Sequence, residues 1–175
     1  MRPQCSVFIA ASLDGFIARR DGNIDWLSIV ERPNEDYGFK RFFDTVDALV
    51  IGRKTWETAK GFEPWPYAGK RVVVLTHREL EAKHDEERYE GKPEPLVEKL
   101  GAEGVKRVYV DGGNVIRQFL AANLISDLTL SIIPILLSEG EPLFGKLGHD
   151  VPLKLRDAQK FESGLVQLHY DVTTT

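Results

Sequence analysis

Apolar runs and helical patterns alternate along the first part of the chain. Segments rich in apolar and β-branched residues predict buried strands at 6–11, 46–51, 71–76 and 108–110. Apolar side chains recur at helical spacing in 36–43, in 96–100 and in the segment that follows Gly112-Gly113. Buried strands separated by helices are typical of an α/β protein with a largely parallel sheet.

The pattern changes after Ala122. Residues 127–137 predict one or two strands with a break at Pro134, and 153–161 and 165–172 predict further strands. Apolar and polar side chains alternate in the last of these, as in an antiparallel strand with one exposed face. We therefore expect an α/β fold whose mixed, mostly parallel sheet has an antiparallel C-terminal edge. The charged segment 79–95 is rich in turn formers and predicts a surface loop.

Length and composition narrow the class of protein. A chain of 175 residues is most simply one domain, here 1–175. Its net charge of −4 argues against nonspecific binding of nucleic acid. The single cysteine, Cys5, excludes an internal disulfide and a cysteine metal cluster, and the histidines lack metal-site spacing, so we expect no metal. No apolar run is long enough to span a membrane, and we expect a cytoplasmic protein without a membrane partner.

The carboxyl ends of three predicted strands carry groups suited to phosphate binding. Ligands of an open parallel sheet bind beyond these ends. The groups are Gly52, Arg53, Lys54 and Thr55, then Thr76, His77 and Arg78, and finally Gly112, Gly113 and Asn114. Two glycine turns for a pyrophosphate and an Arg/His pair for a 2′-phosphate indicate NADPH rather than NADH. The alternatives are ordinary turns and solvated charges.

Five motifs, taken in order, resemble the dihydrofolate reductase superfamily. They are Ala10–Ala18, Val50–Trp56, Val110–Gly113, Pro134–Leu137 and Gly140–Phe144. The chain is most similar to the branch that includes the C-terminal reductase domain of the bifunctional riboflavin-biosynthesis deaminase-reductase. This resemblance implies a three-layer fold, with helices on both faces of a sheet of about eight strands, and NADPH in the cleft.

The resemblance also implies roles for individual residues. It places Ala10 and Ala11 by the nicotinamide; Gly52, Arg53, Lys54 and Thr55 at the pyrophosphate and 2′-phosphate; Thr76, His77 and Arg78 at the adenosine end; and Gly112, Gly113, Asn114 and Val115 at the pyrophosphate. Asp36 precedes Gly52 at the spacing that the catalytic acid has in folate reductases, and Ser131 stands where those enzymes carry a threonine that hydrogen-bonds the acid. The alternative for Asp36 is a helix cap.

Three further residues are candidates for substrate contact. They are Trp26, for which a place in the core is the alternative, and two lysines, Lys40 and Lys70. Folate reductases carry an arginine for the folate tail where Lys70 stands, and an apolar residue where Lys40 stands. A lysine lacks the bidentate fork of arginine and matches a carboxylate less well.

The leading hypothesis is an NADPH-dependent reductase that acts on a small pyrimidine- or pterin-type molecule. Its specific form is reduction of 5-amino-6-(5-phosphoribosylamino)uracil in riboflavin biosynthesis. The alternatives are a dihydrofolate reductase and a nucleotide-binding module without catalysis. The resemblance further suggests a homodimer formed through the C-terminal strands, whose exposed edges suit such pairing.

Overall fold

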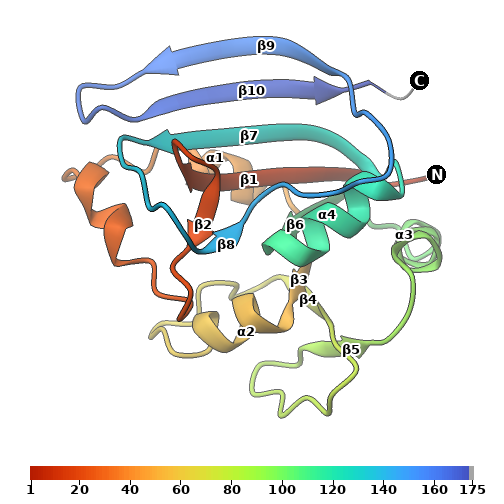
Figure 1. The fold of residues 1–175 in the computed structure, drawn as a ribbon. Helices are drawn as coiled ribbons and strands as arrows, with labels where there is room; N and C mark the ends of the chain where they lie inside the picture. Colours follow the sequence, from red (N-terminus) through yellow and green to blue (C-terminus); the bar gives the residue numbers. More distant parts are fainter. Residues whose placement is uncertain (174–175) are drawn as a thin grey trace.

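An eight-stranded sheet forms the centre of the protein in the computed structural model, which describes residues 1–173 (Figure 1). The strands are β1 (Gln4–Ser12), β3 (Ala48–Gly52), β4 (Arg71–Leu75), β5 (Glu87–Tyr89), β6 (Arg107–Asp111), β7 (Ile125–Ile133), β9 (Leu153–Lys160) and β10 (Val166–Val172). Their spatial order is β5-β4-β3-β6-β1-β7-β10-β9. The first six of these run parallel, whereas β10 is antiparallel to β7 and β9 is antiparallel to β10. The predicted mixed sheet with an antiparallel C-terminal edge is confirmed.

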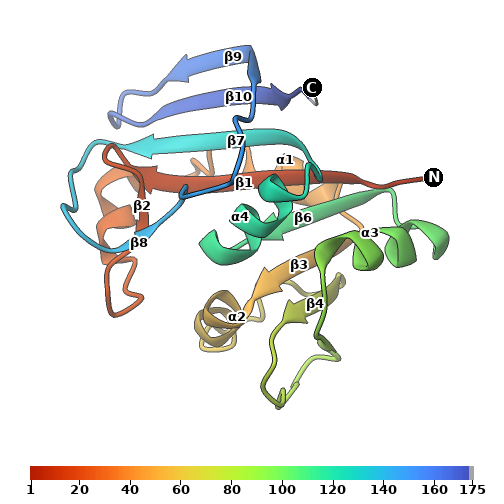
Figure 2. The same cartoon turned by 45° about the vertical axis from the view of Figure 1, so that its right-hand side comes forward.

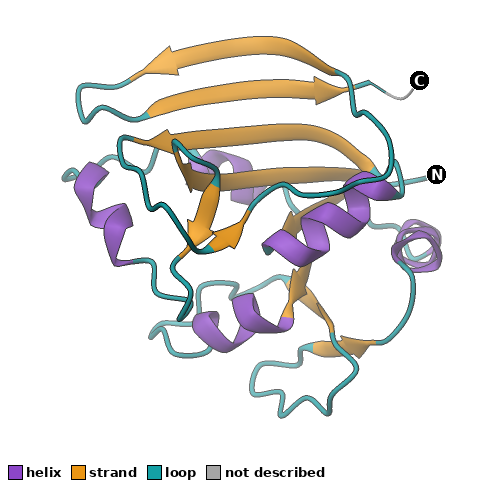
Figure 3. Ribbon diagram, in the orientation of Figure 1, coloured by secondary structure: helices purple, strands orange, loops and turns teal. Residues whose placement is uncertain are grey.

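Helices cover both faces of this sheet (Figures 2 and 3). The helices are α1 (Phe39–Asp44), α2 (Arg53–Ala59), α3 (Pro93–Ala102) and α4 (Gly113–Ala121). Leu49 and Ile51 of β3 belong to the apolar cluster of α1 and α2, whereas Val50 belongs to the cluster of α3 and α4. Because successive side chains of a strand point to opposite faces, the two helix pairs lie on opposite sides. The three-layer fold is therefore confirmed.

Smaller elements join the ends of the long strands. Strand β2 (Phe16–Ala18) pairs with β8 (Glu141–Pro142), and the 3-10 helix η1 (Asp25–Val30) precedes α1. The Asp14 carboxylate accepts hydrogen bonds from the backbone N–H groups of Leu137 (3.1 Å) and Ser138 (2.8 Å). These bonds hold the loop after β1 against the loop after β7.

The apolar pattern explains the strands well. Four successive residues of β3, from Ala48 to Ile51, are fully buried, as expected for a parallel strand covered on both faces. Strand β7 ends at Ile133, immediately before Pro134, which has no N–H to continue the ladder. Cys5 is fully buried in β1. No helix within residues 1–173 is both long and apolar enough to cross a membrane.

Helix boundaries differ from the sequence expectations. The helix predicted at 36–43 begins only at Phe39, because Tyr37 (φ 55°) and Gly38 (φ 84°) adopt left-handed backbone conformations. The helix predicted at 96–100 is longer and begins at Pro93, a residue that suits a first helical turn because its missing N–H is not needed there.

The expectation that 79–95 is only a surface loop was wrong. Residues 87–89 of this segment form the edge strand β5, and α3 begins inside it. A strand of three residues with two charged side chains has too few apolar positions to produce a recognisable alternation.

Candidate functional site

Two glycine turns meet at the carboxyl ends of β3 and β6. Gly112 has φ 96°, and a Cβ built on it would lie 2.8 Å from the Thr55 hydroxyl oxygen and 3.5 Å from the backbone nitrogen of Gly52. A Cβ on Gly52 would lie 3.3 Å from the Val115 side chain. The two turns are therefore in direct contact, and only glycine fits at position 112 without moving them.

Cationic side chains lie around these turns. Arg53 Nη1 donates to the carbonyl of Glu79 at 3.0 Å and lies 3.5 Å from the Thr76 hydroxyl, which joins the ends of β3 and β4. Lys54 forms an exposed ion pair with Glu141 at 3.4 Å. These contacts bring two of the three predicted phosphate-binding strand ends to one edge, and the third, at Gly112, adjoins them.

The remaining predicted cofactor residues lie along the same edge. His77 is exposed and pairs with Glu90 (2.9 Å), and the Arg78 N–H donates to the Thr76 hydroxyl (3.2 Å). Asn114 is exposed in the first turn of α4. Ala10 and Ala11 lie further along, near the end of β1, where they pair with Ser131 and Ile132 of β7.

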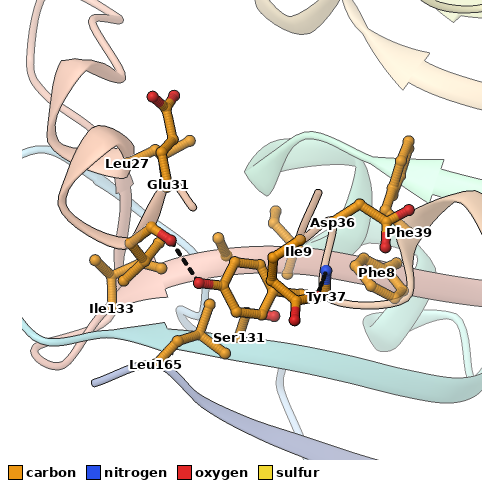
Figure 4. Close-up of a pocket in the computed structure, with 13 residues that line it drawn as sticks. Phe8, Ile9, Leu27, Glu31, Asp36, Tyr37, Phe39, Ser131, Ile133 and Leu165 are labelled. Carbon is orange, nitrogen blue, oxygen red and sulfur yellow. Dashed lines mark hydrogen bonds between the residues drawn. The ribbon is translucent and has the colours of Figure 1, made fainter. Parts of the chain in front are cut away.

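A cavity of about 310 Å³ opens beside β1, β7 and α1 (Figure 4). Its wall is mostly apolar, and Asp36, Glu31, Glu35, Tyr37 and Ser131 supply the polar groups. The other lining residues are Phe8, Ile9, Ala10, Leu27, Val30, Phe39, Ile133 and Leu165. A mostly apolar cavity with a few convergent polar groups is the usual form of a small-molecule site. The structure thus brings the two predicted catalytic residues, Asp36 and Ser131, to one cavity that Ala10 also lines.

Asp36 both lines the cavity and caps α1, so the helix cap is confirmed and the catalytic role stays a prediction. Its carboxylate accepts hydrogen bonds from the backbone N–H groups of Lys40 and Gly38, both at 2.9 Å. These two bonds hold the pKa of Asp36 below its usual range. Asp36 is therefore a carboxylate at neutral pH, which suits it to anchor a ligand N–H rather than to supply a proton.

Asp111 is a candidate that the sequence reasoning missed. It ends β6, and its Oδ1 accepts the Gly112 N–H at 2.8 Å. Burial raises the pKa of Asp111 to about 6, although the Gly112 N–H opposes that shift. The neighbouring Tyr109 hydroxyl donates its hydrogen to the carbonyl of Phe8, which lines the cavity. The available signal was an acidic residue directly after the apolar run 108–110 and before a glycine turn.

The three predicted substrate residues do not line the cavity. Trp26 is only 2% exposed and lies in the core, yet its indole N–H has no hydrogen-bond partner within residues 1–173. Lys40 pairs with Asp44 at 2.6 Å on the surface of α1. Lys70 donates to the carbonyl of Val46 at 2.6 Å. The lysines are thus engaged elsewhere, whereas Trp26 carries a buried donor beside a residue that lines the cavity, Leu27.

The sequence model of the RibD C-terminal domain matches residues 3–167. The chain belongs to the RibD C-terminal domain family. The match includes all the residues proposed above for cofactor, substrate and catalysis, from Ala10 to Ser131. Within residues 1–173, no group of three or more His, Cys, Asp or Glu side chains could hold a metal ion.

Three proteins are similar to this RibD C-terminal domain over most of its length. A solved structure of a Shewanella sp. PV-4 protein named for riboflavin biosynthesis is 36% identical, has a TM-score of 0.91, and aligns over 99% of this chain and 100% of its own. The Bacillus subtilis protein YwjB is 33% identical over 174 residues, which are 97% of this chain and 98% of YwjB. The dihydrofolate reductase HdrB of Haloferax volcanii is 34% identical over 125 residues, which are 68% of this chain and 62% of HdrB.

Proposed function

We propose that this chain is an NADPH-dependent reductase that transfers hydride to a pyrimidine- or pterin-type substrate. The specific substrate proposed is 5-amino-6-(5-phosphoribosylamino)uracil, an intermediate of riboflavin biosynthesis. The observation that carries the proposal is that two touching glycine turns lie at the same edge of the sheet as the cavity of Asp36 and Ser131. Membership of the RibD C-terminal domain family and likeness to a protein named for riboflavin biosynthesis support this choice of substrate.

The residues at the strand ends fit a dinucleotide. The first N–H groups of α4 have no side-chain cap, and Gly112 leaves room where a Cβ would collide with Thr55. A pyrophosphate would lie against these N–H groups, with the positive end of the helix toward it. Arg53, beside Thr76, would hold the 2′-phosphate. When bound, the cofactor supplies the hydride.

We assign different tasks to Asp36, which lines the cavity, and to Asp111, which ends β6. Asp36, ionised at neutral pH, would accept hydrogen bonds from N–H groups of the substrate ring and orient it. Reduction of a C=N bond also needs a proton, and Asp111 is the better donor because its pKa is raised to about 6. Its Oδ1 is occupied by the Gly112 N–H, so Oδ2 is the atom that would hold the proton.

Dihydrofolate reduction is the second candidate. The likeness to HdrB and the presence of Asp36 and Ser131 in one cavity favour it. The hydrogen bond from Lys70 to the Val46 carbonyl counts against dihydrofolate as the substrate. Lys70 stands where folate reductases carry the arginine that binds the folate tail, and its ammonium group is already engaged.

The test is NADPH oxidation followed by absorbance, with dihydrofolate and the deaminated riboflavin precursor assayed in parallel. Turnover of the precursor alone supports the proposal, and turnover of dihydrofolate alone supports the second candidate. NADPH binding without turnover of either compound would leave a reductase of another substrate or a module without catalysis. As a control on the site, Asp36→Asn should lower turnover while Asp44→Asn, on the outer face of α1, should leave it unchanged.

We also propose that two copies of the chain associate through their C-terminal strands. All eight residues of β9 are exposed, and they form the edge of the sheet. Leu153 and Leu155 are 44% and 52% exposed. An exposed edge strand with apolar side chains is a template for pairing with another chain. Sedimentation that finds only monomer at assay concentrations would reject this association.

A further inference from the structure

Four polar side chains form a continuous line below the cavity, on strands β7 and β10. Ser131 and Thr129 of β7 lie directly opposite Gln167 and His169 of β10. Gln167 is 3% exposed and Ser131 is 4% exposed. Buried polar groups must satisfy one another, so the direction of each hydrogen bond in this line can be worked out from its partners.

The Tyr37 carbonyl fixes the orientation of the Gln167 amide. It lies 2.9 Å from Nε2 and can only accept, so the nitrogen of the amide must face it. The second hydrogen of Nε2 is then directed at the Ser131 hydroxyl oxygen, 3.0 Å away. The amide oxygen is left to accept from His169 Nε2 at 3.1 Å.

The hydrogen bond between His169 and Thr129 does not change the direction of the bond from His169 to Gln167. His169 Nδ1 lies 3.0 Å from the Thr129 hydroxyl, which can donate to a neutral ring or accept from a protonated one. In both cases His169 Nε2 donates to the Gln167 oxygen. The orientation of Gln167 is therefore independent of the charge on His169.

The Ser131 hydroxyl consequently accepts from Gln167 and keeps its own hydrogen. Within residues 1–173, the Ser131 hydroxyl has no hydrogen bond besides the one from Gln167, and the Asp36 carboxylate accepts from backbone N–H groups instead. Ser131 lines the cavity, so the natural partner of the unused hydrogen is an atom of a bound ligand.

We infer that Gln167 is a positioning residue that fixes the Ser131 hydroxyl as a hydrogen-bond donor to the ligand. The site then selects a ring that presents a carbonyl oxygen to Ser131 over one that presents an amino group. An amino group could reach only the second lone pair of the hydroxyl and would leave its hydrogen unpaired. This inference rests on the proposed function only in taking the cavity as the substrate site.

The test compares 5,6-diaminouracil with 2,5,6-triaminopyrimidin-4-one, which differ at one ring carbon and in the hydrogen on one adjacent ring nitrogen. The first has a carbonyl oxygen where the second has an amino group. Calorimetry of the full chain saturated with NADPH should give about tenfold tighter binding of the diaminouracil, as expected for one satisfied hydrogen bond. Ser131→Ala and Gln167→Met should each reduce that ratio to within about twofold, because the directed donor is lost.

The controls separate positioning from general damage. Ser131→Ala keeps the bond from Gln167 to Tyr37, so it tests the donor without loosening the loop before α1. Ser131→Thr retains a hydroxyl and should restore the ratio. Gln159→Met changes the exposed neighbour of Gln167 on β9 and should leave the ratio as it is. The affinity for NADPH should be the same in all four variants.

The inference is overturned if the unmodified protein binds the two compounds equally, prefers the triamino compound or binds neither. It is also overturned if Ser131→Ala keeps the tenfold ratio. Turnover of the riboflavin precursor together with equal binding would refute the inference alone. A tenfold ratio without any turnover would refute the proposed reductase activity and leave the role of Gln167 standing.

Discussion

Replacing Asp111 with asparagine should stabilise the protein at neutral pH, although it removes a residue of the proposed site. Burial raises the pKa of this carboxyl from 3.8 to about 6, so the folded protein resists its ionisation. A shift of about two units corresponds to at most about 3 kcal/mol, and to less here because Asp111 is only partly buried. Asparagine has no charge to bury, and its Oδ1 can still accept the Gly112 N–H, which lies 2.8 Å from Asp111 Oδ1.

The size of this stabilisation depends on pH in a defined way. Below the unfolded pKa of 3.8, the carboxyl is protonated in both states and its burial carries no electrostatic penalty. As the pH rises from there toward about 6, the unfolded state ionises first and the folded state loses stability. Above that range the loss is complete, and the advantage of Asp111→Asn reaches its full size.

Urea unfolding of both proteins across this pH range measures the effect. The free energy of unfolding of Asp111→Asn minus that of the unmodified protein should rise with pH and then level off. Asp47→Asn is the matched control with the opposite sign, because N–H groups of Arg107 and Lys106 lower the pKa of Asp47. A stability difference for Asp111→Asn that is the same at every pH would falsify the assignment of a raised pKa.

The same carboxyl should control turnover. If Asp111 Oδ2 holds the transferred proton, the turnover of the unmodified protein falls as the pH rises above about 6. Asp111→Asn should be slow at all pH values despite its greater stability at neutral pH. A variant that is both more stable and fully active would show that burial of Asp111 has no part in the reaction.

Three further changes test other parts of the protein. Gly112→Ala should weaken NADPH binding at least about tenfold, because its Cβ would collide with the neighbouring turn. Gly104→Ala is the control, since Gly104 also has a positive φ but faces open space, and it should leave NADPH binding unchanged. Titration of cofactor fluorescence measures the affinity of both variants. Asp36→Asn should lower kcat/KM for the substrate and leave NADPH affinity unchanged, and equal kcat/KM values would reduce Asp36 to a helix cap. Trp56→Phe removes the buried hydrogen bond from the indole N–H to Glu86 (2.8 Å) and should lower the free energy of unfolding by about 1–3 kcal/mol, measured by chemical denaturation. An unchanged free energy of unfolding would show that this bond does not stabilise the protein.

Local signals in the sequence were sufficient to find the two glycine turns at the carboxyl edge of the sheet. Each glycine turn follows an apolar run and precedes a helix, so its position and its placement at the carboxyl end of a strand follow from the chain alone. The contact between Gly112 and Thr55 confirms that the two turns belong together. The strand β5 was missed for the opposite reason, since three residues, two of them charged, carry no periodic signal.

Substrate residues were harder to predict because their roles depend on partners far away in the chain. Lys70 is separated from Val46 by a strand and a helix, yet that carbonyl binds its ammonium group. Trp26 lies in the core, and only the structure reveals that its indole N–H is unpaired among the described residues. Residue type and spacing give no information about which long side chain is already engaged.

Asp36 and Asp111 illustrate the limit of sequence-based prediction most directly. Asp36 and Asp111 are the same residue type, yet backbone N–H groups lower the pKa of the first and burial raises that of the second. The spacing before Gly52 identifies the expected catalytic acid by its position in the sequence and therefore selects Asp36. The environments separate the two carboxyls, because Asp36 is ionised throughout the neutral range whereas Asp111 keeps its proton up to about pH 6, which is why we propose Asp111 as the proton donor. The position of a carboxyl in the sequence thus selected one that lines the cavity, whereas hydrogen-bond partners and burial, which only the structure shows, set the protonation of each carboxyl.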